Sequence, residues 1–203
     1  MANSTKDENI IADDAWGMPL IGIRLSEPFE EIVAKNPELR IEQNANGEIL
    51  CMPPTGGESG FRNSEITSEL FQWAKRYGGR TFDSSTLFRL PNGAKRSPDA
   101  SWISMERWNA LSSGDRKKFP PLCPDFLIEL RSETDRLDEL QLKMNEYLSV
   151  GLRLGWLIDP LQKQVHIYRP DRQIEVLVSP ASVFCEDILP GFVLDLKGIW
   201  VDA

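Results

Sequence analysis

A glutamate stands inside a very apolar stretch of the chain. The segment DFLIEL (125–130), read as a strand, places Leu127 and Glu129 on one face and three apolar side chains on the other. A strand that is apolar on both faces is typical of the middle of a covered sheet. Because burying an unpaired carboxylate is costly, Glu129 needs a partner there. A metal ion and a salt bridge to an arginine both meet that need.

A second carboxylate, Asp99, follows Pro98 at the start of another predicted strand, SPDASWIS (97–104). Two carboxylates on neighbouring strands can chelate one hard divalent cation, and Mg²⁺ prefers such oxygen ligands together with water. Asp99 and Glu129 are therefore the predicted ligands of Mg²⁺ or Mn²⁺. A turn or capping role is the alternative interpretation of Asp99.

Phosphodiester cleavage also needs a basic group near the metal, to orient the attacking water and to stabilise charge on the phosphate. Arg131 lies two residues after the strand glutamate and should share its face, but arginine stays protonated and cannot act as a base. Lys143 lies at the edge of the apolar stripe of a predicted helix, from which its ammonium could reach the sheet. A surface salt bridge with Glu139 or Glu146 is the alternative for Lys143.

The remaining elements predict an α/β fold, with a mixed sheet flanked by helices. Asn46-Gly47 indicates a hairpin turn, PPTGGESG (53–60) a loop, and apolar spacing a helix over 63–77. The Lys143 helix is predicted over 133–150. Further strands are predicted at 154–159, 164–169 and 174–178. Residues 1–20 are polar and aperiodic, so we expect a flexible N-terminal arm followed by a single domain over 21–203.

Composition excludes several classes of protein. The chain has 203 residues, of which 41% are hydrophobic, without the run of about 20 apolar residues that a membrane span requires. The N-terminus lacks the pattern of a secretory signal. Three scattered cysteines argue against a disulfide framework or a zinc site. The single histidine, His166, is read as a tolerated surface position. We therefore expect a cytoplasmic protein without a membrane partner.

The net charge of −8 at first argues against a nucleic-acid partner. Between Lys75 and Lys118, however, ten basic residues accompany four acidic ones, which gives +6 there and −14 elsewhere. A local basic surface is compatible with phosphate contact, although an ordinary solvated face is the alternative. The acidic balance of the whole chain predicts weak substrate binding or a homodimer that assembles a basic cleft.

Several ordered motifs together resemble the Uma2 family, which is similar to the PD-(D/E)xK restriction-endonuclease superfamily. The resemblance covers about residues 26–200 and rests on the segments SPDASWIS, CPDFLIELRSETD, LQLKMNEYLSVGLRLGWLIDP, QVHIYRP and LPGFVLDL. It implies a restriction-endonuclease-like αβββαβ core with a magnesium site. Asp99 would be the aspartate of the PD element and Glu129 the second acidic residue. The usual lysine position holds Arg131, and Lys143 fits the lysine that the family carries on the following helix.

The first functional hypothesis is a Mg²⁺-dependent nuclease acting on DNA, with Asp99 and Glu129 as ligands, the Leu130 carbonyl as a further ligand, and Lys143 positioning water and phosphate. The second is a nuclease fold without catalysis that serves as a binding module. A hydrolase of another phosphate ester is the third. Convergence of the two acids with Lys143 discriminates the first from the second.

Two further positions bear on the site. In the family that the sequence resembles, many members have a histidine at the position of Asn63. Because Asn63 replaces it, we expect no histidine to contribute to this site. Glu58 is a candidate third acidic group near the metal, and a solvated loop residue is its alternative reading.

Overall fold

The computed structural model describes residues 10–13, 19–22, 28–185 and 187–200. Residues 1–9 and 14–18 of the predicted N-terminal arm therefore lie outside the described residues. The rest of that arm contributes two short strands, β1 (Ile10–Asp13) and β2 (Pro19–Gly22), which pair in antiparallel fashion.

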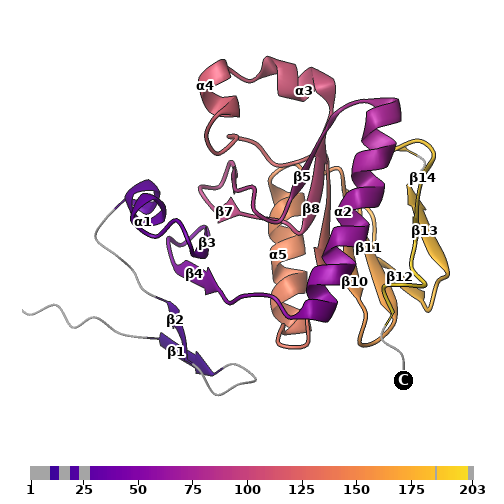
Figure 1. The fold of residues 1–203 in the computed structure, drawn as a ribbon, viewed down its shortest axis with the longest axis horizontal. Coiled ribbons are helices and arrows are strands. Elements are labelled where there is room, and N and C mark those ends of the chain that lie inside the picture. The colour runs from indigo at the N-terminus through magenta and orange to yellow at the C-terminus, as the bar shows by residue number, and fades with distance from the viewer. Residues whose placement is uncertain (1–9, 14–18, 23–27, 186, 201–203) are drawn as a thin grey trace, which may run out of the picture.

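A six-stranded mixed sheet forms the centre of the fold, in the order β12-β11-β10-β9-β8-β5 (Figure 1). Its strands are β5 (Arg80–Asp83), β8 (Ala100–Ile103), β9 (Phe126–Leu130), β10 (Leu154–Asp159), β11 (Gln164–Tyr168) and β12 (Glu175–Val178). Only the β9–β10 pair is parallel among these neighbours. All five residues of β9 are buried, as predicted for a strand with neighbours on both sides.

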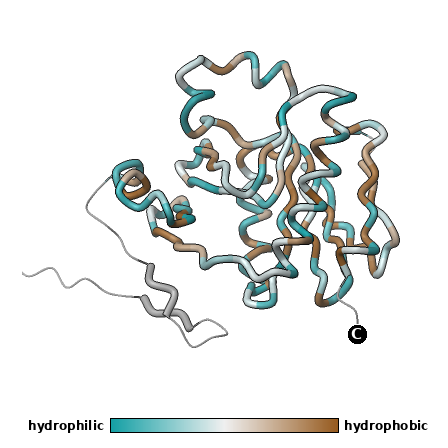
Figure 2. The backbone as a smooth tube through the Cα atoms, in the orientation of Figure 1, coloured by the Kyte–Doolittle hydropathy of each residue, from teal (hydrophilic) through white to brown (hydrophobic). Residues whose placement is uncertain are grey.

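The alternation of side chains along β9 separates two hydrophobic layers. Phe126, Ile128 and Leu130 enter the core beneath helix α2 (Gly57–Tyr77) and the hairpin β13 (Ser182–Cys185)–β14 (Phe192–Asp195). Leu127 enters the opposite core, beneath helix α5 (Leu137–Ser149). Figure 2 shows hydrophobic residues concentrated along the central strands. Glu129 follows Leu127 by two positions and therefore points into the layer of α5.

A second, four-stranded sheet has the order β4-β3-β7-β6. The hairpin predicted at Asn46-Gly47 joins β3 (Arg40–Gln43) to β4 (Ile49–Met52), and Gly47 adopts the positive φ of 84° that such a turn favours. β6 (Phe88–Arg89) and β7 (Lys95–Arg96) complete the sheet. Helix α1 (Phe29–Lys35) packs on it through Phe29 and Ile32.

Two helices differ from the predicted ranges. α2 begins at Gly57, so the predicted loop at 53–60 is wrong over its last four residues. Glu58 in the first turn complements the helix dipole and pairs with Arg62 one turn later, which compensates for the poor helix propensity of the glycines there. α5 begins later than predicted, at Leu137. Two short helices, α3 (Met105–Ala110) and α4 (Ser113–Arg116), lie in the connection from β8 to β9.

Candidate active site

Asp99 and Glu129 lie side by side at one end of the central sheet. Ala100 of β8 pairs with Ile128 of the antiparallel strand β9. Asp99 immediately precedes Ala100 and Glu129 immediately follows Ile128, so the same register brings the two acids opposite each other. The strand pairing therefore brings together the two carboxylates that the sequence singled out.

The Asp99 carboxylate is held by two donors. Its Oδ1 accepts a hydrogen bond of 3.1 Å from Nδ2 of Asn63 on α2, and its Oδ2 accepts one of 2.9 Å from the backbone N–H of Leu130. Burial raises the pKa of Asp99, while the Leu130 N–H and the Lys143 ammonium act in the opposite direction. These contacts tie the aspartate to the neighbouring strand and to α2, which a free turn residue would not require.

Glu129 is only 3% exposed, and its Oε1 meets two groups from α5. The hydroxyl of Tyr147 donates to it at 2.9 Å, and Nζ of Lys143 lies 3.0 Å away. The pKa of Glu129 is raised to about 7, first by burial and then by the charges of Asp99 and Glu42, while Lys143 acts in the opposite direction. The alternative of a salt bridge is confirmed for Glu129, but the partner is Lys143 and not an arginine.

Lys143 is enclosed by acids. Its Nζ lies 3.1 Å from Oε1 of Glu42 as well as beside Glu129, and its side chain is 11% exposed. Burial alone would lower the pKa of Lys143, but the two carboxylates outweigh burial and raise it. The surface salt bridge considered from the sequence is wrong. Glu139 pairs with Arg136, and Glu146 pairs with Arg96.

Glu42 is the site residue that the sequence analysis missed. It lies on β3, is 3% exposed, and accepts a 2.7 Å hydrogen bond from the backbone N–H of Ser97 at Oε1. Arg96 lies 3.2 Å from its Oε2. In the sequence, a glutamate that follows Ile41 in a short strand is equally typical of a solvent-facing position, so only the contact with α5 identifies it.

Three other residues lie away from this cluster. Glu58 is 80% exposed and pairs with Arg62. It is exposed to solvent, as its alternative supposed, but it lies in the first turn of α2 and not in a loop. The guanidinium of Arg131 pairs with the fully buried Asp159 at 2.8 Å and donates to the carbonyl of Asp135. His166 is buried on β11 beside Gln164, so its reading as a surface residue is wrong.

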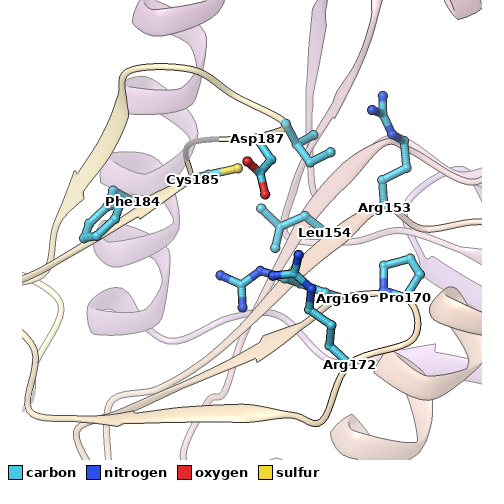
Figure 3. Close-up of a pocket in the computed structure, with 9 residues that line it drawn as sticks. Arg153, Leu154, Arg169, Pro170, Arg172, Phe184, Cys185 and Asp187 are labelled. Atoms are coloured by element: carbon cyan, nitrogen blue, oxygen red, sulfur yellow. The ribbon is translucent and has the colours of Figure 1, made fainter.

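The described residues contain no group of three or more His, Cys, Asp or Glu side chains arranged to hold a metal ion. The strand register places two carboxylates, Asp99 and Glu129, opposite each other. A cavity of about 350 Å³ lies elsewhere, where β10 begins and β11 ends. Arg169, Arg172 and Asp187 line it (Figure 3). Because β10 begins beside Phe126, this cavity is at the other end of β9 from Glu129.

Comparison with known proteins agrees with this fold. Residues 26–197 match the Uma2 family, described as "Putative restriction endonuclease". The crystal structure of a protein from Anabaena variabilis, described as a "putative nuclease belonging to DUF820", superposes with a TM-score of 0.68. The two chains are 23% identical, and the match covers 80% of this chain and 90% of that one. No curated protein matches the sequence significantly. In the part of the chain that the structure describes, no helix has the length and apolarity to cross a membrane.

Proposed function

Because the chain belongs to the Uma2 family, we propose that it is a metal-dependent nuclease that hydrolyses phosphodiester bonds in DNA. The observation that carries the proposal is the convergence of three side chains. Asp99 and Glu129 meet through the β8–β9 register, and Lys143 lies 3.0 Å from Glu129. A binding module without catalysis does not require a buried acid, a partly buried acid and a lysine to meet at one point.

The charge of the site fits a divalent cation. The carboxylates of Glu42, Asp99, Glu129 and Glu146 gather around the basic groups of Lys143 and Arg96, with Arg40 near Asp99. Burial is the main reason that the pKa values of Asp99 and Glu129 are raised, and at Glu129 the neighbouring carboxylates of Asp99 and Glu42 add to it. Mg²⁺ and Mn²⁺ would be held by Asp99 and Glu129, with the carbonyl of Leu130 as a further ligand. Oxygen donors of this kind match the preference of these ions.

When bound, such an ion supplies Lewis-acid stabilisation of the phosphate and activates water. The protein's own residues would stabilise the phosphate charge and orient the metal ligands. Lys143, whose pKa is raised, stays protonated near neutral pH and stabilises the negative charge that develops on the phosphate oxygens. Lys143 therefore positions and neutralises rather than removing a proton from water. Tyr147 fixes the orientation of the Glu129 carboxylate by donating to Oε1.

DNA is the proposed substrate because the stretch from Lys75 to Lys118 carries exposed basic residues. Six of the ten basic residues between positions 75 and 118 are exposed, namely Lys75, Arg76, Arg80, Arg89, Lys117 and Lys118. Arg96 belongs to the same stretch but is buried in an ion pair with Glu42, so it is not available to a substrate. The positive charge of the exposed residues would attract a polyphosphate to an otherwise acidic protein. Arg80 pairs with Ile103, at the other end of β8 from Asp99, so this attraction is a general one and not a contact at the site.

The test is a cleavage assay on supercoiled and linear double-stranded DNA, single-stranded DNA and RNA, with Mg²⁺, Mn²⁺ or a chelator. We expect cutting of DNA with either ion and none with the chelator. Asp99→Ala, Glu129→Ala and Lys143→Ala should each abolish cutting while circular dichroism still shows a folded protein. Unchanged cutting by the Glu129 variant would refute the catalytic assignment, and no cutting of any nucleic acid by the wild type would refute the proposed function.

A further inference from the structure

Glu42 reaches the site from a different sheet. It lies on β3 of the four-stranded sheet, whereas Asp99, Glu129 and Lys143 lie on or beside the six-stranded sheet and its helix α5. Its two oxygens accept from three donors: Oε1 from the Ser97 N–H and the Lys143 ammonium, and Oε2 from Arg96. Burial of this carboxylate is thus matched by hydrogen bonds and by two positive charges.

These contacts form a closed ring through one helix. Lys143 and Glu146 lie three residues apart on α5. Lys143 contacts Glu42 at 3.1 Å, Glu42 contacts Arg96 at 3.2 Å, and Arg96 contacts Glu146 at 2.7 Å. The ring fixes both oxygens of the Glu42 carboxylate relative to α5. It consequently fixes the position of the Lys143 ammonium, which contacts one of these oxygens.

Glu42 and Glu129 both contact the Lys143 ammonium, but their other partners differ. Glu129 has the ammonium and the Tyr147 hydroxyl as partners, and it is a ligand of the proposed metal ion. A cation on Glu129 weakens the attraction of that carboxylate for a neighbouring ammonium. Glu42 keeps its own partners, Arg96 and Ser97, and is the acid that would still hold Lys143 once the metal site is filled.

A role for Glu42 as a metal ligand is less consistent with these contacts. Two of the three donors to Glu42 are the cations Lys143 and Arg96, which a metal ion would have to displace. The two donors to Asp99, by contrast, are a neutral amide and a backbone N–H. Lysine is a long, flexible side chain that loses considerable rotamer entropy when it is fixed. A group that fixes its ammonium before the substrate arrives therefore favours catalysis.

We propose that Glu42 is a positioning residue that holds the Lys143 ammonium beside the metal site, so that the four-stranded sheet completes the active site. This inference rests on the nuclease function proposed above. Glu42 of β3 would then affect the cleavage rate without taking part in metal binding by Asp99 and Glu129.

The experiment compares Glu42→Gln with Glu129→Gln and with the control Glu38→Gln, an exposed glutamate two residues before β3. Mn²⁺ affinity is measured by calorimetry, and DNA cleavage by single-turnover kinetics at saturating Mn²⁺. We expect Glu42→Gln to keep its Mn²⁺ affinity within about threefold and to lose about 100-fold in rate, as when one preorganised charge contact is removed. Glu129→Gln should lose Mn²⁺ binding, and Glu38→Gln should match the wild type.

A second readout does not depend on cleavage. The Lys143 ammonium is followed by nuclear magnetic resonance of the Mg²⁺-saturated protein, its signal being assigned by its loss in Lys143→Met. We expect a protected ammonium in the wild type, rapid exchange in Glu42→Gln, and partial recovery in Glu42→Asp, which keeps the charge. If Glu42→Gln does not fold, the same two measurements are made on Glu42→Asp, whose shorter side chain should hold the ammonium less well.

The outcomes separate the two proposals. An unchanged Lys143 signal or an unchanged cleavage rate in Glu42→Gln overturns the positioning role, as does loss of Mn²⁺ binding equal to that of Glu129→Gln, which would make Glu42 a ligand. Absence of cleavage by the wild type, with the Lys143 signal still dependent on Glu42, overturns the nuclease function and leaves the positioning of Lys143 supported.

Discussion

Lys143 of helix α5 and Glu129 of the central strand β9 form a buried ion pair, with Nζ of the lysine 3.0 Å from Oε1 of the glutamate. The two residues are 14 positions apart in the sequence and belong to different layers of the fold. Their contact joins the helix to the end of the sheet at which Asp99 also lies.

Replacing Lys143 should affect both activity and stability. Lys143→Met leaves the buried acids Glu42 and Glu129 without their shared ammonium, and loss of one partner of a buried pair costs about 3 kcal/mol. We expect the free energy of unfolding at pH 8 to fall by that order and cleavage to fall at least about 100-fold. Urea denaturation and single-turnover kinetics measure the two effects. The control Lys197→Met removes an exposed lysine and should change neither.

The metal-free protein should lose stability as pH rises toward 7. Burial first of all, then Asp99 and Glu42, raises the pKa of Glu129 to about 7 against an ordinary 4.5, so the folded state binds this proton more tightly than the unfolded state. The resulting stability is fully present below about pH 4.5 and is lost as pH rises through 7. Between pH 5 and pH 8 the loss amounts to about 2–3 kcal/mol.

Glu129→Gln isolates this effect from the other titrating groups. The free energy of unfolding of both proteins is measured by urea denaturation without metal. Between pH 5 and pH 8, we expect the wild type to lose stability relative to Glu129→Gln. A difference that does not vary with pH would contradict the assignment of this titration to Glu129.

Mg²⁺ should bind more tightly as pH rises through about 7, because the ion and the proton compete for the Glu129 carboxylate. Thermal unfolding with increasing Mg²⁺ at pH 6 and pH 8 tests this. We expect a larger rise in the unfolding temperature at pH 8 and no rise for Glu129→Gln. An equal rise at both pH values would place the ion on other groups.

Arg131 should matter more for stability than for chemistry. Its guanidinium pairs with the fully buried Asp159 instead of the metal site. Arg131→Met therefore leaves a buried carboxylate unpaired, and we expect a loss of about 3 kcal/mol in unfolding free energy. The double variant Arg131→Met with Asp159→Asn should recover part of that loss in a double-mutant cycle. A cleavage rate that falls in the folded Arg131 variant as far as in Lys143→Met would instead restore Arg131 to the active site.

Asn63 should set the metal affinity through Asp99. Its amide Nδ2 donates to Asp99, while its Oδ1 is buried without a hydrogen-bond partner among the described residues. Removal of a group that orients a metal ligand weakens affinity about 10- to 100-fold, and we expect that loss for Asn63→Ala. Asn63→His keeps a donor and should retain more affinity. Calorimetry with Mn²⁺ measures both, with the exposed Asn109→Ala as control.

Local patterns were sufficient to predict several parts of this protein. The apolar run around Glu129 predicted a central covered strand, and β9 is buried between two neighbours. Asn46-Gly47 predicted the turn between β3 and β4. These predictions succeeded because side-chain alternation and turn conformation depend on neighbouring residues. The start of α2 was missed because glycines at positions 57 and 60 disfavour a helix, while a favourable charge and an ion pair at Glu58 stabilise it.

The sequence by itself determined that Glu129 lies in an apolar strand and needs a partner, and it indicated Asp99 on a neighbouring strand and Lys143 on the following helix as groups that could meet it. Only the tertiary structure decided their partners. It brought Glu42 from a second sheet to Lys143, turned Arg131 to Asp159, and buried His166. The reason is physical: the free energy of a buried charge depends on which groups the packing of distant elements brings within a few ångströms, and no local pattern records that distance.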